Sequence, residues 1–237
     1  MISLVLLVGL TACSPGPANT DPDDEQATPA PSALAPSASA APGAPASGSG
    51  VPLKEAIALL VVGEESRSGY ERDAFQHWID EDGDGCDTRR EVLLAEATTK
   101  PTQAARCAIT GGAWTSFYDG AAVTDAKKLD IDHMVALAEA WDSGASDWTA
   151  QRREQYANDL GSERSLIAVT AKSNRSKSDK DPSQWLPPAA SAHCVYAADW
   201  TATKLRWKLG ADKTEQAALE KLAAACPDTL VEYQVAP

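Results

Sequence analysis

Two stretches of the chain constrain its fold more than any others: residues 129–135, LDIDHMV, and residues 166–181, LIAVTAKSNRSKSDKD. The first alternates apolar and polar residues and delivers an Asp-His pair to its end, which is typical of a short strand. The second begins with the apolar run 166–169 and continues into a polar turn or helix that carries Asn174. Together they predict two strands followed by a helix.

Helical spacing of apolar residues dominates the rest of the chain after residue 50. Asp212 and Glu215 form a capping box in front of a final helix that includes Leu219 and Cys226. We therefore expect an α+β fold, in which residues 51–237 form one mostly helical domain around a small sheet. The other predicted helices lie at residues 53–62, 68–79, 136–141, 148–160 and 195–209.

The N-terminus, MISLVLLVGLTAC, is an apolar run that ends in a cysteine. It is too short to cross a bilayer as a stable helix, and small residues before a cysteine are typical of a lipoprotein signal peptide. We expect residues 1–13 to be such a signal peptide and Cys13 to carry the lipid. Because no Lys or Arg precedes the run, the true start could lie upstream, and a core strand is the alternative.

Residues 14–50 consist mainly of Ala, Pro, Ser and Gly, with one acidic cluster. Such a segment buries too little apolar surface to offset its ordering entropy. We expect these residues to form a disordered tether that holds the folded domain at the extracellular face of the membrane. The alternative is that the protein is secreted.

Cysteine usage agrees with export. Apart from Cys13, the chain has four cysteines, an even number that in an oxidising compartment predicts two disulfides. Three pairings are possible, and we favour Cys86–Cys107 with Cys194–Cys226, because each closes a short local loop. A zinc site built from all four cysteines is the alternative, although no CxxC spacing is present.

An acidic loop at residues 80–91 matches the spacing of an EF-hand calcium loop. Asp80, Asp82 and Asp84 alternate along it, and Glu91 stands where a bidentate ligand closes the shell. Asp87 occupies a position that is normally apolar, and Cys86 is expected to be tied in a disulfide. The loop is therefore a possible second site, for Ca2+, or an acidic turn that binds nothing tightly.

The formal net charge of −13 argues against nucleic-acid binding through bulk electrostatics. Local basic segments at residues 152–153, 172–180 and 204–213 could still contact phosphates, or they are ordinary solvated helix faces.

The Asp-His pair and Asn174 suit phosphodiester hydrolysis, which needs a hard cation and a base. Oxygen atoms of Asp132 and Asn174 could hold Mg2+ or Mn2+, and His133 has a near-neutral intrinsic pKa suited to a general base. In a strictly extended strand His133 would face away from Asp132, so we expect the strand to end there.

The segments DIDHMVALAEAW, YANDL and LIAVTAKSNRSKSDKDPSQWLPP resemble the secreted HNH nucleases of the DUF1524 group, which is related to the C-terminal domain of GmrSD-type restriction enzymes. The segment SNRSKSD is also similar to part of the HNH domain of CRISPR effector nucleases. The likeness runs from about residue 70 to residue 226.

This resemblance implies a ββα-metal (HNH) core and a metal-dependent endonuclease. It implies that His133 activates water, that Asp132 and Asn174 bind the metal, and that Asn158 braces the loop between the strands. Because Asn174 stands where many members have a final His, this is an HNN variant. Arg175 and Lys177 would contact phosphate oxygens or the transition state.

The expected substrate is nucleic acid, DNA more than RNA, cut by a monomer without marked sequence preference. The alternative is a non-catalytic surface lipoprotein that binds calcium or a partner. The complete set of competent residues at positions 132, 133, 158 and 174 argues against it.

Overall fold

The computed structural model describes residues 50–237, and all structural statements below concern this part of the chain. The predicted signal peptide at residues 1–13, the lipidation of Cys13 and the tether, apart from Gly50, lie outside the described residues. None of the helices in the described part is long and apolar enough to span a membrane.

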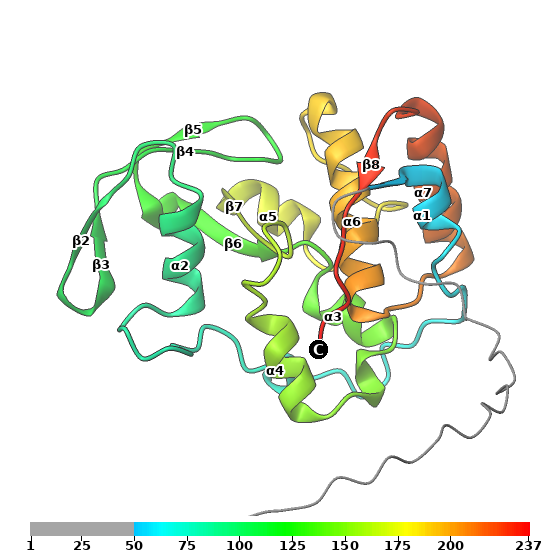
Figure 1. Cartoon of the computed structure of the whole chain (residues 1–237), viewed down its shortest axis with the longest axis horizontal. Helices are drawn as coiled ribbons and strands as arrows, with labels where there is room; N and C mark the ends of the chain where they lie inside the picture. The colour runs from blue at the N-terminus through cyan, green and yellow to red at the C-terminus, as the bar shows by residue number, and fades with distance from the viewer. Residues whose placement is uncertain (1–49) are drawn as a thin grey trace, which may run out of the picture. The chain divides into compact units, whose positions relative to one another are not determined.

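Within residues 50–237, seven α-helices accompany four two-stranded antiparallel sheets, so the predicted α+β class is confirmed (Figure 1). The helices are α1 Leu53–Ile57, α2 Thr88–Ala95, α3 Leu137–Asp142, α4 Ala150–Ala157, α5 Ala171–Lys177, α6 His193–Trp207 and α7 Lys213–Ala225. The strands are β1 Val51–Pro52, β2 Thr102–Ala104, β3 Ala108–Thr110, β4 Trp114–Thr115, β5 Ala122–Val123, β6 Leu129–His133, β7 Leu166–Thr170 and β8 Leu230–Val231.

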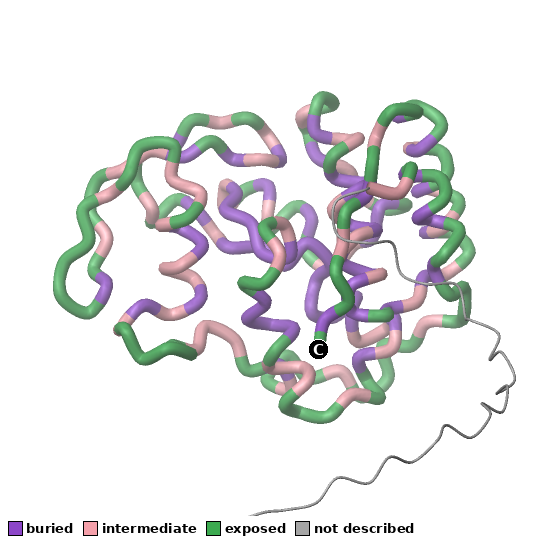
Figure 2. Tube along the Cα trace, in the orientation of Figure 1, coloured by how far each residue is buried: buried purple, intermediate pink, exposed green. Residues whose placement is uncertain are grey.

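The pair β6–β7 lies in the middle of the fold. The strands are antiparallel, with Leu129 opposite Thr170 and His133 opposite Leu166. One face packs against α2 in a smaller apolar cluster, and the other face joins the main core. Figure 2 shows both strands as buried, whereas the β2–β3 hairpin is largely exposed. Helix α5 begins directly after β7, as the sequence predicts.

Helix α6 organises the C-terminal half. It buries Trp200 and Trp207 and packs against α1 and α7 (Figure 1). At the start of α7 the Asp212 carboxylate accepts a hydrogen bond from the backbone N–H of Glu215 at 2.7 Å, which is one half of the predicted capping box. The Glu215 side chain does not complete the box but points toward Lys204.

Two disulfides, Cys86–Cys107 and Cys194–Cys226, are present, in the pairing that closes local loops. The first links the start of α2 to the turn before β3, and the second links the start of α6 to the end of α7. Four-cysteine zinc binding does not occur, since all four sulfurs are used.

Residues 68–79 do not form the predicted helix. A single 3₁₀ turn, Arg72–Ala74, is present, and the backbone has positive φ at Gly69 (73°) and Trp78 (63°), which an α-helix cannot include. Phe75 is nevertheless buried, because its ring packs edge-on against Trp141 and Tyr156. The apolar stripe thus marks core contacts made by an irregular segment.

A buried charge cluster joins three helices. The amine of Lys204 on α6 is fully buried and donates to Glu139 at 2.9 Å, to Glu215 at 2.6 Å and to the Ser143 hydroxyl at 2.9 Å. Glu65 lies 3.7 Å away. Burial raises the pKa of Glu215 to about 8 and that of Glu65 to about 7. Because one ammonium faces three carboxyl groups, the cluster is expected to hold protons near neutral pH.

Candidate active site

Asp132 and His133 end strand β6 beside the start of α5. Thr170 caps α5 by accepting a hydrogen bond from the backbone N–H of Ser173. The side-chain hydroxyls of Thr170 and Ser173 both donate hydrogen bonds to the Asp119 carboxylate. Burial opposes ionisation of Asp119, but hydrogen bonds from neighbouring hydroxyls lower its pKa to about 2. The ionised carboxylate therefore fixes the start of the helix next to β6.

A pocket of about 400 Å³ lies where β6, α3 and α5 meet. Four of the predicted site residues line it: Asp132, His133, Asn174 and Arg175. The structure thus brings together residues that are about 40 positions apart in the chain. Tyr70 and Arg72, from the irregular segment before α2, also line this pocket and were not predicted.

The ring of His133 is buried between two aromatic side chains. It stacks against Trp78 and Tyr156 at centroid distances of 5.7 and 6.2 Å, and its Nε2 lies 2.9 Å from the carbonyl oxygen of Ala157. A carbonyl oxygen can only accept, so Nε2 carries the hydrogen and Nδ1 keeps the lone pair. Burial lowers the pKa of His133 to about 3, well below the near-neutral value that favoured it as a base in the sequence, so the ring is neutral near pH 7 and is a weaker base than free imidazole.

The lowered pKa of His133 makes the stability of the fold depend on pH. Between about pH 6.5 and about pH 3 the unfolded chain binds a proton here that the folded chain does not, so stability contributed by the neutral ring is lost as the pH falls. We expect the wild type to lose more stability than His133→Gln when urea unfolding is compared at pH 7 and pH 5. Equal losses would contradict a neutral buried ring.

Asp132 presents one oxygen to the protein interior. The residue is 6% exposed, and its Oδ2 accepts hydrogen bonds from the Tyr118 hydroxyl at 2.6 Å and the Lys177 amine at 2.7 Å. Burial raises the pKa of this carboxyl group, and Lys177 opposes the shift. Oδ1 makes no hydrogen bond to any of residues 50–237, which leaves it available to a ligand in the pocket.

Asn174 is oriented by a second aspartate. Its Nδ2 donates to Oδ2 of Asp130 at 3.2 Å, which leaves the amide oxygen free of this contact. Asp130 and Asp132 lie on the same face of β6 because side chains alternate along a strand. Asp130 was not among the predicted site residues, although its spacing of two residues from Asp132 is the signal that could have found it.

Lys177, which was predicted to contact phosphate, lies in the core and not in the pocket. Its side chain is fully buried, its amine bonds Asp132 and the carbonyl oxygen of His133, and it does not line the pocket. It therefore cannot contact a phosphate there without leaving the core. Its position instead ties α5 to the end of β6.

Asn158 follows the last residue of α4 and is bonded on both sides of its amide. Nδ2 donates to the carbonyl oxygens of Gln76 and Glu154, each at 2.8 Å, and Oδ1 accepts from the Thr88 hydroxyl at 2.8 Å. These bonds fix the end of α4, where the neighbouring carbonyl of Ala157 receives His133 Nε2. Bonds of this kind are what bracing the loop between the two strands requires, and that role of Asn158 stays a prediction.

Known proteins similar to this chain identify its family. Residues 86–222, more than half of the chain, match the family described as GmrSD restriction endonucleases, C-terminal domain. The chain belongs to this GmrSD C-terminal domain family. A protein of Arthroderma benhamiae, described as an uncharacterized secreted protein, is 41% identical over 168 residues, which are 71% of this chain and 81% of the relative. No solved structure was found to match.

The stretch matched to the GmrSD C-terminal domain family contains β6, β7 and α5, and so all four pocket residues predicted from the sequence. It begins after Tyr70 and Arg72. One wall of the pocket is thus supplied from outside the matched residues.

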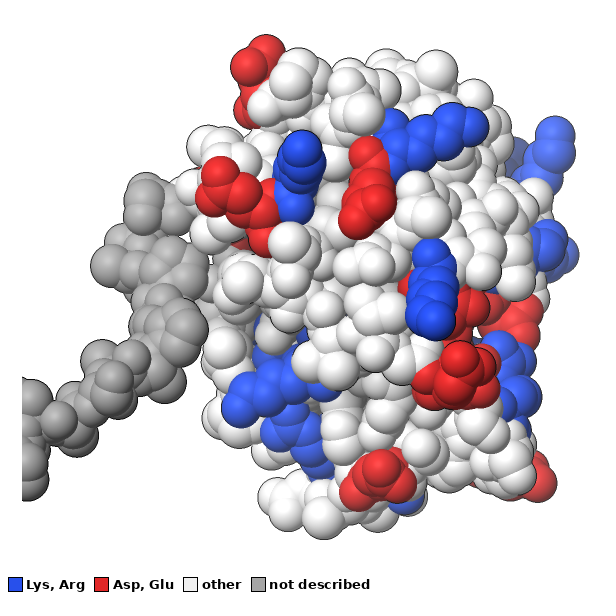
Figure 3. All heavy atoms as spheres, turned by 90° about the vertical axis from the view of Figure 1, so that its right-hand side faces the viewer, with Lys and Arg blue, Asp and Glu red and all other residues white. Residues whose placement is uncertain are grey.

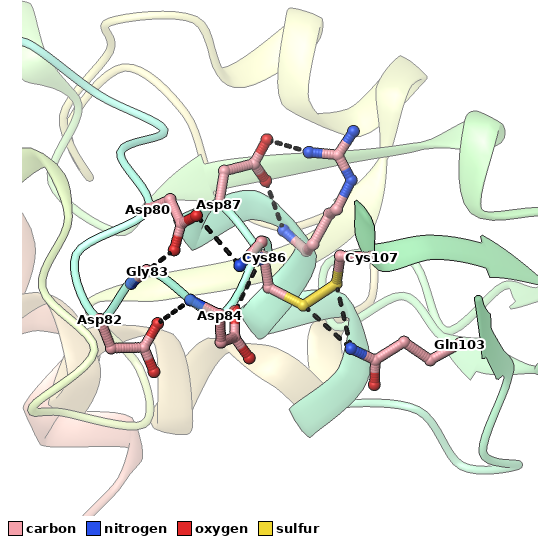
Figure 4. Close-up of a disulfide and its surroundings, with 10 residues drawn as sticks. Asp80, Asp82, Gly83, Asp84, Cys86, Asp87, Gln103 and Cys107 are labelled. Carbon is pink, nitrogen blue, oxygen red and sulfur yellow. Dashed lines mark hydrogen bonds and ion pairs between the residues drawn. A yellow bond between two sulfur atoms is a disulfide. The ribbon is translucent and has the colours of Figure 1, made fainter. Parts of the chain in front are cut away.

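The acidic loop lies in front of α2, and its carboxylates turn toward its own backbone (Figure 4). Oxygen atoms of Asp80, Asp82 and Asp84 lie within 4.8 Å of one another. Burial and these three carboxylates raise the pKa of Glu91. The Cys86–Cys107 disulfide holds the end of the loop. Calcium binding by this loop stays a prediction.

Proposed function

We propose that the protein is a metal-dependent endonuclease of the HNH type that hydrolyses phosphodiester bonds in nucleic acid. The observation that carries the proposal is the pocket in which β6 and α5 place Asp132, His133, Asn174 and Arg175 together. The order of the elements, two antiparallel strands followed at once by a helix, is the one expected for a ββα-metal core. Membership of the GmrSD C-terminal domain family supports it.

The oxygen donors in the pocket fit a hard divalent cation, Mg2+ or Mn2+. Oδ1 of Asp132 is free of hydrogen bonds to residues 50–237, and the amide nitrogen of Asn174 is turned to Asp130, so both residues can offer oxygen. Carboxylate and amide oxygens are the ligands that such ions prefer. When bound, the cation supplies positive charge that offsets the charge developing on the phosphate.

His133 would act as the general base. Water attacks phosphorus, and the proton it loses goes to Nδ1, because Nε2 is held by Ala157. The bond between phosphorus and the leaving oxygen breaks, and that oxygen keeps the electron pair and takes a proton from solvent. Stacking between Trp78 and Tyr156 holds the ring in one orientation throughout.

Substrate binding has to be local in a chain of net charge −13. Lys and Arg side chains are interspersed with Asp and Glu on the face over α1 and α7 (Figure 3), so this face offers no continuous basic surface among the described residues. Arg175 in the pocket is the predicted phosphate contact. We expect DNA, rather than RNA, to be cut without strong sequence preference.

The proposed location is outside the cell, where the lipid on Cys13 would hold the nuclease at the membrane. The description of the Arthroderma benhamiae relative as secreted and the two disulfides support export.

The test is plasmid cleavage by the full-length chain with its disulfides intact, in Mg2+, in Mn2+ and in EDTA. We expect cleavage that requires the metal, and a loss of roughly 10²–10⁴-fold in kcat in His133→Ala. His193→Ala is the matched control, because its ring also bonds a carbonyl oxygen but lies outside the pocket. Folded wild-type protein that cuts neither DNA nor RNA in any metal would reject the proposal.

A further inference from the structure

The segment from Glu65 to Phe75, here called the strap, crosses the rim of the pocket. Arg67 anchors it by pairing with Asp142 at the end of α3, at 2.6 Å, and with Asp179 just after α5. The indole N–H of Trp141 adds a hydrogen bond to the carbonyl oxygen of Ser68 at 3.1 Å. The first half of the strap is therefore fixed to two elements that border the pocket.

The second half of the strap is fixed just as firmly. Phe75 is 1% exposed in the main core, and Arg153 donates to the carbonyl oxygen of Ala74 at 3.2 Å. Beyond the strap, Asn158 donates to the carbonyl oxygen of Gln76. Arg72 lies between these anchors, at the start of a 3₁₀ turn, and its side chain lines the pocket.

The charge of Arg72 is uncompensated. Arg67, in the same strap, pairs with Asp142 and Asp179, whereas Arg72 forms no ion pair with any of residues 50–237, and neither does Arg175 in the same pocket. Arg72 is exposed and lines the same pocket as His133. An unpaired cation held at a pocket in a strongly acidic protein points to an anionic ligand.

We infer that Arg72 binds the two non-bridging oxygens of the scissile phosphate and stabilises the negative charge that builds up there during attack. The inference rests on the proposed function and gives Arg72 the role that was predicted from the sequence for Lys177 beside Arg175. Arg72 moves no proton: His133 takes the proton of the attacking water, and the leaving oxygen keeps the electron pair of the broken bond.

Physical chemistry favours Arg72 over Lys177 for this role. Lys177 is enclosed and bonded to Asp132, so its charge is already used. A guanidinium keeps its charge at all relevant pH values and presents paired N–H groups that match two phosphate oxygens. Arg175 approaches from α5 and Arg72 from the strap, so the two cations reach the pocket from different elements.

The test compares kcat and KM for a DNA duplex in Mg2+ between the full-length wild type, Arg72→Ala and Arg72→Lys. We expect Arg72→Ala to lower kcat by about 10²-fold with a smaller change in KM, as for other transition-state donors. Arg72→Lys should recover part of the loss, because the charge stays while the two-point contact goes. Arg106→Ala is the matched control, since Arg106 is exposed and lies outside the pocket.

Two measurements separate this role from a structural one. They are the affinity of the protein for Mn2+ in the absence of DNA, measured by calorimetry, and the midpoint of thermal unfolding. Both should be unchanged in Arg72→Ala. A wild-type kcat in Arg72→Ala overturns the inference alone, and so does a loss of activity that accompanies lost Mn2+ binding or a fall of several degrees in the midpoint. A wild type that cuts nothing rejects the proposed function and the inference with it.

Discussion

Replacement of Lys177 by methionine is expected to lower the free energy of unfolding by roughly 3–5 kcal/mol. The amine is fully buried and bonds both Asp132, at 2.7 Å, and the carbonyl oxygen of His133, at 2.9 Å. Methionine fills most of the volume but leaves the Asp132 carboxylate buried without its cation. The Tyr118 hydroxyl would be its remaining hydrogen-bond donor.

Urea unfolding of Lys177→Met beside Lys172→Met checks this expectation. Lys172 lies on the same helix and is exposed, so its replacement should change stability by less than about 0.5 kcal/mol. Cleavage should also fall in Lys177→Met, since the amine positions Asp132. Unchanged stability with a raised KM for DNA would instead return Lys177 to the phosphate-binding role.

Lys204→Met is expected to destabilise the fold by a comparable amount, roughly 3–5 kcal/mol at pH 8. Removing the amine leaves Glu139, Glu215 and Glu65 close together with no cation. These groups can respond by taking up protons, so the cost should shrink as the pH falls.

The sign of this pH dependence follows from the raised pKa values of Glu215, about 8, and Glu65, about 7. The folded state binds protons that the unfolded state does not between about pH 4.5 and pH 8, so stability from these groups is lost as the pH rises. In Lys204→Met the loss on going from pH 5 to pH 8 should exceed that of the wild type. Lys213→Met, at an exposed position on α7, serves as control. A pH-independent difference between Lys204→Met and the wild type would contradict the model of a proton-holding cluster.

The parts of the fold with a strict local signal were predictable. Alternation in residues 129–133 and the apolar run 166–169 mark β6 and β7, and the polar residues that follow mark α5. Local loop closure likewise favours the two observed disulfides. In each case the decisive contacts lie close in sequence or repeat with a fixed period.

The strap was not predictable in the same way. Phe75 and Trp78 have helical spacing with Ile79, and the pattern does not reveal that Gly69 and Trp78 take positive φ. The burial of Phe75 depends on two aromatic partners more than 50 residues away, Trp141 and Tyr156. Long-range packing of this kind overrides local propensity.

The lysines show a second limit. Lys172, Lys177 and Lys204 look alike in the sequence, yet the first is exposed and the other two are fully buried. Burial became possible because other segments supply carboxylates to each buried amine: Asp132 to Lys177, and Glu139 and Glu215 to Lys204. For the same reason Arg72 was missed: it reaches the pocket from a segment with no motif of its own.

The residues that line the pocket come from two separate stretches of the chain. Asp132, His133 and Asn174 come from the stretch that defines the GmrSD C-terminal domain family, whereas Arg72 comes from the strap that precedes it. Under the proposed function, a change in the strap would therefore alter how the charge on the attacked phosphate is stabilised, while Asp132, His133 and Asn174 stay in place. Two relatives with the same residues at positions 132, 133 and 174 would then differ in turnover.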